Sequence, residues 1–153
     1  MKTLSILLVF AITLSCKQKY ESVIYSIPSN YEGNVLIIFD QKSGVPPLYE
    51  NGRRVYEIPS SGVLRTQFSP ISLYEVYFRY KDSSEIKYLT SSDSKNKKND
   101  SNEIVICNLE PGEYEPKKDI KLTYQIFSVC SLKSMENIGD KRDDFIWTNI
   151  LPN

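Results

Sequence analysis

Apolar residues recur at every second position in several short segments, and this period limits the fold more than any other feature of the sequence. A period of two places successive side chains on opposite faces of a β-strand. The clearest case is 72–80, where the alternate positions are Tyr74, Val76, Phe78 and Tyr80. The segment 34–40 is a nearly continuous apolar run, which is typical of a strand buried on both faces. These segments predict a mainly β domain.

Three further segments, 85–90, 103–109 and 119–132, also have the composition of strands. The first follows a turn-like Lys-Asp-Ser-Ser cluster, so it is expected to form a hairpin with 72–80. The other two are separated by Glu-Pro-Gly-Glu and a further proline within 110–116, which predicts a turn there.

The period becomes helical in the C-terminal part of the chain. Leu132, Met135 and Ile138 are spaced for one face of a helix. Gly139 is a favoured helix stop, and a second helix is expected over 140–151 with its first aspartate as the N-cap. Together these patterns predict a single antiparallel β-sandwich or open barrel-like domain with a short C-terminal helical segment.

The chain opens with MKTLSILLVFAITLSC, a basic residue followed by an apolar run. The run is shorter than the ~20 apolar residues of a membrane-spanning helix, and its ends are typical of a secretory signal peptide at 1–15. Thr13-Leu14-Ser15-Cys16 resembles the lipobox of bacterial lipoproteins, in which the cysteine becomes the first mature residue and carries acyl chains. Thr13 departs from the usual leucine. The alternative is an ordinary signal peptide followed by a chance cysteine.

The lipobox resemblance implies an anchored protein of the bacterial cell envelope. Cys16 would be the lipid attachment site, 16–26 would be the lipidated cysteine with a tether, and 27–153 would be a single β-rich domain. Two or more acyl chains hold a protein stably on a membrane. Lys17 stands where an aspartate would favour the inner membrane, so the outer membrane is predicted. Whether the domain faces the periplasm or the medium stays open.

Charge and cysteine content limit the partners and the covalent structure. The 19 basic and 19 acidic residues give a formal net charge of zero, so no basic excess exists to neutralise phosphates and nucleic acid is not a predicted partner. Cys107 and Cys130 lie in apolar segments. They could form a disulfide in an oxidising compartment, or they could be free thiols in the core, as small apolar thiols commonly are.

The sequence contains no histidine. This excludes Ser-His and Cys-His nucleophile pairs and removes the commonest metal ligand. The sequence also lacks phosphate-binding, zinc and calcium motifs, so no cofactor and no metal are predicted. A carboxylate pair for glycoside hydrolysis stays open, but nothing in the sequence selects one pair. We therefore expect a protein that is not an enzyme.

The stretch 51–68, NGRRVYEIPSSGVLRTQF, places arginines on both sides of a Pro-Ser-Ser-Gly turn. Its alternation predicts a strand that ends at Pro59 and a second strand that starts at Val63. We interpret the arginines as a solvent-facing surface, paired with Glu50 or Glu57. The alternative is that they contact a ligand, and the residues concerned are Arg53, Arg54 and Arg65.

The segment 27–68 also resembles a domain of unknown function found in short secreted proteins and lipoproteins of bacteria. The residues that carry this resemblance are Ile27-Pro28, Tyr31, Gly33, Phe39-Asp40-Gln41, Gly44, Pro46-Pro47, Glu50, Gly52, Arg54-Val55-Tyr56, Ile58-Pro59, Ser61-Gly62-Val63-Leu64 and Thr66-Gln67. The resemblance implies an envelope location and a small β-rich domain, and it supplies no catalytic residues.

Two functions from different classes remain open at this point. One is a non-catalytic envelope module that binds a protein, peptide or glycan, or that has a structural role. The other is an inhibitor or immunity-type lipoprotein that acts on a hydrolase or toxin in the periplasm. Exposed tyrosines could stack on a glycan, although β-strands are naturally rich in tyrosine. The candidates are Tyr74, Tyr77, Tyr80 and Tyr88.

Overall fold

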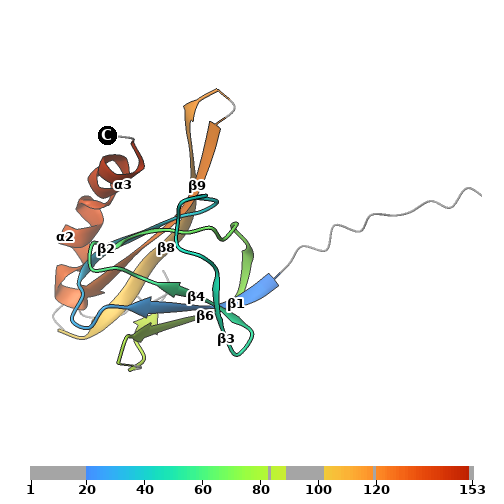
Figure 1. Cartoon of the computed structure of the whole chain (residues 1–153). Coiled ribbons are helices and arrows are strands. Elements are labelled where there is room, and N and C mark those ends of the chain that lie inside the picture. The colour runs from blue at the N-terminus through green and yellow to red at the C-terminus, as the bar shows by residue number, and fades with distance from the viewer. Residues whose placement is uncertain (1–19, 83, 89–101, 119, 152–153) are drawn as a thin grey trace, which may run out of the picture.

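The computed structural model describes residues 20–82, 84–88, 102–118 and 120–151. Two β-sheets pack face to face, and C-terminal helices cover the outer face of one of them (Figure 1). The prediction of a mainly β sandwich with a short C-terminal helical segment is confirmed. The strand pairing is mixed, however, because several neighbouring strands are parallel.

The first sheet, sheet A, has the strand order β3-β4-β1-β6. Its strands are β1 (Tyr20–Ile27), β3 (Leu48–Glu50), β4 (Arg53–Glu57) and β6 (Ser72–Tyr80). Strand β1 pairs in parallel with both β4 and β6, and β3 pairs antiparallel with β4. The strands β1, β4 and β6 therefore all begin at the same end of sheet A.

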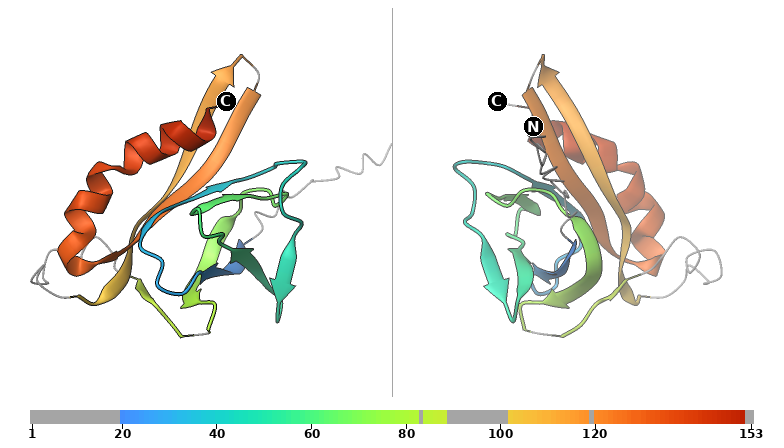
Figure 2. Two further views of the ribbon diagram at one scale, coloured as in Figure 1. Left: turned by 60° about the vertical axis from the view of Figure 1, so that its left-hand side comes forward. Right: turned by 90° about the vertical axis from the view of Figure 1, so that its right-hand side faces the viewer.

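The second sheet, sheet B, has the strand order β5-β2-β9-β8-β7. Its strands are β2 (Gly33–Ile38), β5 (Val63–Arg65), β7 (Lys87–Tyr88), β8 (Ile104–Lys117) and β9 (Ile120–Ser131). Strand β9 is central and antiparallel to β2 and β8, while β5 and β7 are short parallel edge strands. The far ends of β8 and β9 project beyond the sandwich (Figure 2).

The core lies between the two sheets and is rich in aromatic rings. Tyr25 is fully buried and stacks on Tyr56 and Phe78, with ring centroids 5.4 and 4.9 Å away. Its hydroxyl donates a hydrogen bond to the side chain of Gln125 on the opposite sheet. A buried tyrosine needs such a partner for its polar end. This bond therefore ties the sheets together across the core.

The C-terminal part forms η1 (Leu132–Ser134), α2 (Met135–Asp140) and α3 (Arg142–Ile150). The predicted stripe is confirmed, since its three residues pack on the outer face of β8 and β9. Gly139 does not stop the helix, because α2 includes it and ends one residue later. Lys141 is the N-cap of α3, so Asp140 does not have the predicted capping role. Among the described residues, no helix has the length and apolarity to cross a membrane.

Strand β8 runs straight through the residues predicted as a turn, so that prediction is wrong. A bulge after Cys107, with Asn108 at a φ of 56°, precedes these residues, and Glu110 to Glu113 then pair with β9 in continuous register until a second shift after Tyr114. Among the described residues, β7 pairs with Val105 and Ile106 alone, so within that part of the chain the rest of β8 is an edge on that side. Prolines are tolerated on edge strands because no ladder hydrogen bond is lost there.

Two other predictions need correction. The range 16–26 predicted as a tether overlaps β1, whose Val23 and Tyr25 are fully buried, so residues 20–26 belong to the folded domain. The segment after β6 begins as a hairpin, with a bridge between Arg79 and Glu85. It then leaves sheet A, and β7 joins sheet B instead.

The stretch 51–68 folds as a strand, a turn and a strand, as predicted. Gly62 donates a backbone hydrogen bond of 2.9 Å to the carbonyl of Pro59, which closes the turn. The two strands do not pair with each other, because β4 belongs to sheet A and β5 to sheet B. The turn therefore carries the chain from one layer of the sandwich to the other.

Candidate functional site

Two arginines extend across the outer face of sheet A in opposite directions. Arg79 of β6 reaches Glu50 of β3 and donates two hydrogen bonds, of 3.0 and 2.6 Å, to its two carboxylate oxygens. Arg53 of β4 reaches the ring of Tyr77 on β6, with 4.3 Å between the guanidinium carbon and the ring centroid. Strand β1 lies between β4 and β6, so both side chains extend over it. Its outward-facing Ile24 is only 4% exposed as a result.

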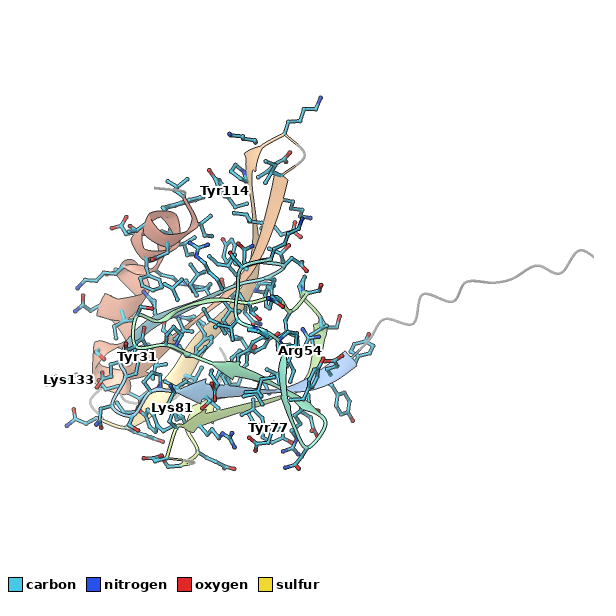
Figure 3. All side chains as sticks on the ribbon, viewed as in Figure 1. Tyr31, Arg54, Tyr77, Lys81, Tyr114 and Lys133 are labelled. Carbon is cyan, nitrogen blue, oxygen red and sulfur yellow. The ribbon has the colours of Figure 1, made fainter. Side chains whose placement is uncertain are left out.

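A pocket of about 290 Å³ opens beside the two arginines, where sheet A meets the connection from β6 to β7. In Figure 3, Tyr77 lies at the bottom of the molecule, on the opposite side from Tyr114 near α3. The polar lining of the pocket, called the sheet A pocket below, consists of Glu50, Arg53, Tyr77, Arg79, Glu85 and Tyr88. The other lining residues are apolar, as in most small-molecule sites.

The connection after β6 is held against the strand by local hydrogen bonds. The carboxylate of Asp82 accepts hydrogen bonds from the backbone and the hydroxyl of Ser84, at 3.0 and 2.6 Å. The backbone N–H of Ile86 donates a hydrogen bond of 2.9 Å to the backbone carbonyl of Phe78. Tyr88 then stacks on the Phe78 ring with 5.6 Å between the centroids. The pocket wall formed by the 84–88 segment is therefore fixed by the fold.

The ion pair between Glu50 and Arg79 in the sheet A pocket shifts the pKa values of both side chains. The hydrogen bonds from Arg79 lower the pKa of Glu50, and the same bonds raise the pKa of Arg79. The hydrogen bond from Tyr77 to Glu75 raises the pKa of the Tyr77 hydroxyl. At neutral pH the pocket therefore contains an ionised Glu50 paired with a charged Arg79, and a protonated Tyr77.

Two charged groups that line the pocket form no ion pair with another described residue. Within the described part of the chain, the Arg53 guanidinium contacts the Tyr77 ring but forms no ion pair. Among the same residues, the carboxylate of Glu85 takes part in no ion pair either. A ligand could therefore contact Arg53 and Glu85 without breaking an existing bond.

The fold separates the three arginines that the sequence placed in one stretch. Only Arg53 lines the sheet A pocket. Arg65 lies on sheet B and donates a hydrogen bond of 2.7 Å to the backbone carbonyl of Asn149 in α3. This bond connects the helix to the sheet. A cation near the last carbonyls of a helix is favourable. The three residues therefore do not form a common ligand site.

Arg54 is buried, so its interpretation as part of a solvent-facing surface is wrong. It is 5% exposed and pairs with Glu21 at 3.0 Å. It also donates a hydrogen bond of 2.5 Å to the backbone carbonyl of Ser69, and its guanidinium carbon lies 4.1 Å from the centre of the Phe68 ring. Its role is therefore structural, because these contacts connect β4 to β1 and to the segment that precedes β6.

The predicted partner of Glu50 was an arginine of the 51–68 stretch, but the structure pairs it with Arg79. Arg79 and Glu85 come from later segments and were missed as pocket residues. The available signal was the alternation in 72–80, which turns Arg79 to the outer face of β6. No sequence pattern predicts that this face of β6 lies beside Glu50, because β3 and β6 are far apart in the chain.

The four tyrosines named as candidates have different positions. Tyr77 and Tyr88 line the pocket, whereas Tyr80 packs against the core between the sheets. Tyr74 is 73% exposed and does not line the pocket. No single aromatic platform therefore combines the four.

Cys107 and Cys130 lie under α2 as buried thiols, with 3.4 Å between their sulfur atoms. They are diagonal neighbours, because Cys107 is opposite Ser128 and Cys130 is opposite Val105. Diagonal pairs typically have Cα atoms ~7–8 Å apart, at or beyond the ~7 Å limit for a disulfide. Both cysteines are free thiols in the structure, and the disulfide stays a prediction. No cluster of metal-ligating residues occurs among the described residues.

Comparison with known proteins gives a match over most of the chain. Residues 19–138 match the model of a family described as "Family of unknown function (DUF6843)". A search of the curated proteins finds no match. Among solved structures, the crystal structure of a "Putative Lipoprotein from Bacillus anthracis" aligns with a TM-score of 0.48 and 14% sequence identity, and the alignment covers 88% of this chain and 100% of that chain.

Proposed function

The chain belongs to this family of unknown function, and we propose that it is a lipid-anchored binding module of the bacterial cell envelope. In this proposal Cys16 carries the acyl chains, and the sheet A pocket binds the ligand. The outer membrane is the proposed site of anchoring, because no aspartate follows Cys16. The protein is proposed to act by binding and without catalysis.

The observation that carries the binding proposal is the pair of unmatched charges in the pocket. Arg53 and Glu85 offer a cation and an anion beside the rings of Tyr77 and Tyr88. A peptide segment can carry both charge signs together with amide groups and apolar side chains. It can therefore contact the charged and the apolar residues of the pocket lining at the same time. A volume of about 290 Å³ suits a few residues of such a segment.

Two features support a role without catalysis. The sequence contains no histidine, which removes the usual general base. The pKa of Glu50 is lowered by its hydrogen bonds to Arg79, whereas a general acid in glycoside hydrolysis needs a raised pKa. Glu50 and Glu85 are thus a poor pair for that reaction.

The anchor is tested first, with the Cys16→Ser variant. We expect the wild-type chain to incorporate labelled palmitate and to stay in the membrane fraction, with the variant losing both properties. Density-gradient separation of inner and outer membranes then tests the outer-membrane assignment. A variant that stays labelled in the membrane fraction would contradict the anchor.

Binding in the pocket is tested by photo-crosslinking in the host cell. A photoreactive phenylalanine analogue replaces either Tyr88 in the pocket or Trp147 on α3, which are 37% and 47% exposed. We expect a specific crosslinked product from position 88 only, and a reduced yield when Arg53→Ala is added. The proposal fails if position 88 gives no product, or if both positions give the same products.

A further inference from the structure

The proposed anchor lies very close in sequence to the first core strand. Strand β1 begins at Tyr20, and Cys16 is only four residues earlier. Even a fully extended chain spans no more than ~3.6 Å per residue, so Tyr20 lies within about 14 Å of the lipidated cysteine. This step rests on the proposed lipidation of Cys16. It means that one particular end of the domain must stay close to the membrane.

The strand register identifies that end. Tyr20 is opposite Ser72 on β6, and Val23 is opposite Arg54 on β4. The turn between β3 and β4, at 51–52, therefore lies level with the start of β1. This end of sheet A, called the tether end below, consists of the starts of β1 and β6 and the 51–52 turn. Figure 1 shows the chain entering β1 on the side of the molecule away from α2 and α3.

Two strongly exposed tyrosines occupy the tether end. Tyr20 is 59% exposed, and Tyr74 is 73% exposed, the highest value among the large apolar and aromatic side chains of the described residues. Tyr74 would face the core if β6 alternated regularly. A bulge prevents this, because β6 advances by three residues, from Leu73 to Val76, while β1 advances by two. The fold thus turns this tyrosine outward.

We propose that the tether end lies in the lipid headgroup layer of the membrane that holds the anchor, with Tyr20 and Tyr74 as its contacts. Tyrosine is enriched at membrane interfaces because its ring is apolar and its hydroxyl is polar. The headgroup region is ~5–7 Å thick on each side of the bilayer, which matches the reach of a tyrosine side chain. The exposed residues Asn51, Gly52 and Pro70 at this end are uncharged, and the exposed carboxylate of Glu75 accepts hydrogen bonds from Ser22 and Tyr77.

A second exposed apolar group competes as a membrane contact. It lies on the other side of the molecule, at α3 and the tip of the β8–β9 hairpin, and its members are Ile120, Trp147 and Leu151. The first turn of α3 carries Asp143 and Asp144, whereas the hairpin tip carries the exposed Lys117, Lys118 and Lys121, so charge does not decide between the two sites. The short tether attaches on the side of Tyr20 and Tyr74. This position favours the tether end.

The test measures the depth of two probes in the full-length lipidated protein. Tyr74→Cys and Trp147→Cys variants are labelled with a small fluorophore, which is selective because Cys107 and Cys130 are buried. The labelled proteins are reconstituted in phosphatidylethanolamine and phosphatidylglycerol vesicles that contain a lipid with a nitroxide on its headgroup. We expect quenching at position 74 to exceed quenching at position 147 by about twofold or more, since only the first lies at the interface.

The outcomes separate this inference from the proposed anchor. Vesicle flotation of wild-type protein and Cys16→Ser shows whether lipidation holds the protein on the membrane. If wild-type protein does not float, the anchor itself fails and this inference fails with it. If it floats but the two probes are quenched equally, or position 147 is quenched more, the anchor stands and the proposed orientation is wrong.

Discussion

Arg54 on β4 and Glu21 on β1 form a buried ion pair, with 3.0 Å between the guanidinium nitrogen and the carboxylate oxygen. Their side chains are only 6% and 9% exposed. Burial acts to lower the pKa of Arg54, but its hydrogen bonds to Tyr56 and Glu21 outweigh this and raise it. The Arg54 guanidinium therefore stays charged throughout the physiological pH range, and the pair contributes to the stability of the sandwich.

Removing the cation from this pair should be strongly destabilising. We expect Arg54→Leu to lower the free energy of unfolding by about 3–5 kcal/mol, because a buried carboxylate loses its cation. Arg65→Leu is the matched control on the exposed surface of sheet B, and it should cost no more than about 1 kcal/mol. Denaturant unfolding followed by circular dichroism measures both. Equal effects of the two variants would contradict the structural role of Arg54.

The 51–68 stretch shows what an alternating pattern can and cannot predict. The pattern correctly grouped Arg54, Tyr56 and Ile58 on one face of a strand. It could not identify that face as the inner one, because the opposite face carries the apolar Val55, which is 4% exposed. A buried arginine needs a partner that is distant in the sequence, and Glu21 is such a partner. Local patterns contain no information about that pairing.

The candidate site could not be predicted for a related reason. The sheet A pocket combines residues from β3, β4, β6 and the connection to β7. The arrangement depends on parallel pairing of β1 with both β4 and β6, which joins segments far apart in the chain. Strand positions follow from periodicity, but the order of strands in a sheet does not. The positions of most strands were therefore predictable, whereas the way in which the fold brings the pocket residues together was not.

The turn at Gly62 should not tolerate a larger residue. Gly62 has a φ of 76°, and an added Cβ would lie 2.6 Å from the carbonyl oxygen of Asn34. We expect Gly62→Ala to lower the free energy of unfolding by at least about 2 kcal/mol through backbone strain and overpacking. Gly139→Ala is the control, because nothing lies within 4 Å of that position in α2. It should raise stability by up to about 1 kcal/mol, and a loss there of similar size would contradict this explanation.

The Glu50–Arg79 pair should make stability depend on pH in the acidic range. The pKa of Glu50 is lowered from its ordinary value of 4.5 by the hydrogen bonds from Arg79. A lowered pKa in the folded state contributes stability above 4.5, and this contribution is lost as the pH falls through the folded-state value. We expect Glu50→Gln to flatten the pH dependence of the urea midpoint between pH 4.5 and the lowered folded-state pKa. Glu57→Gln, an exposed change on the same sheet, should leave the profile like that of the wild type.

The contact between Cys107 and Cys130 gives different expectations for free thiols and for a disulfide. Their diagonal register makes a bridge costly, so we expect both to be alkylated when the protein is unfolded without reductant. Each thiol then contributes only through packing, and Cys107→Ala and Cys130→Ala should each cost about 1 kcal/mol. If a disulfide forms instead, either single variant would lose about 2–4 kcal/mol and the double variant would lose little more. Alkylation followed by mass spectrometry, together with unfolding of the three variants, distinguishes the two cases.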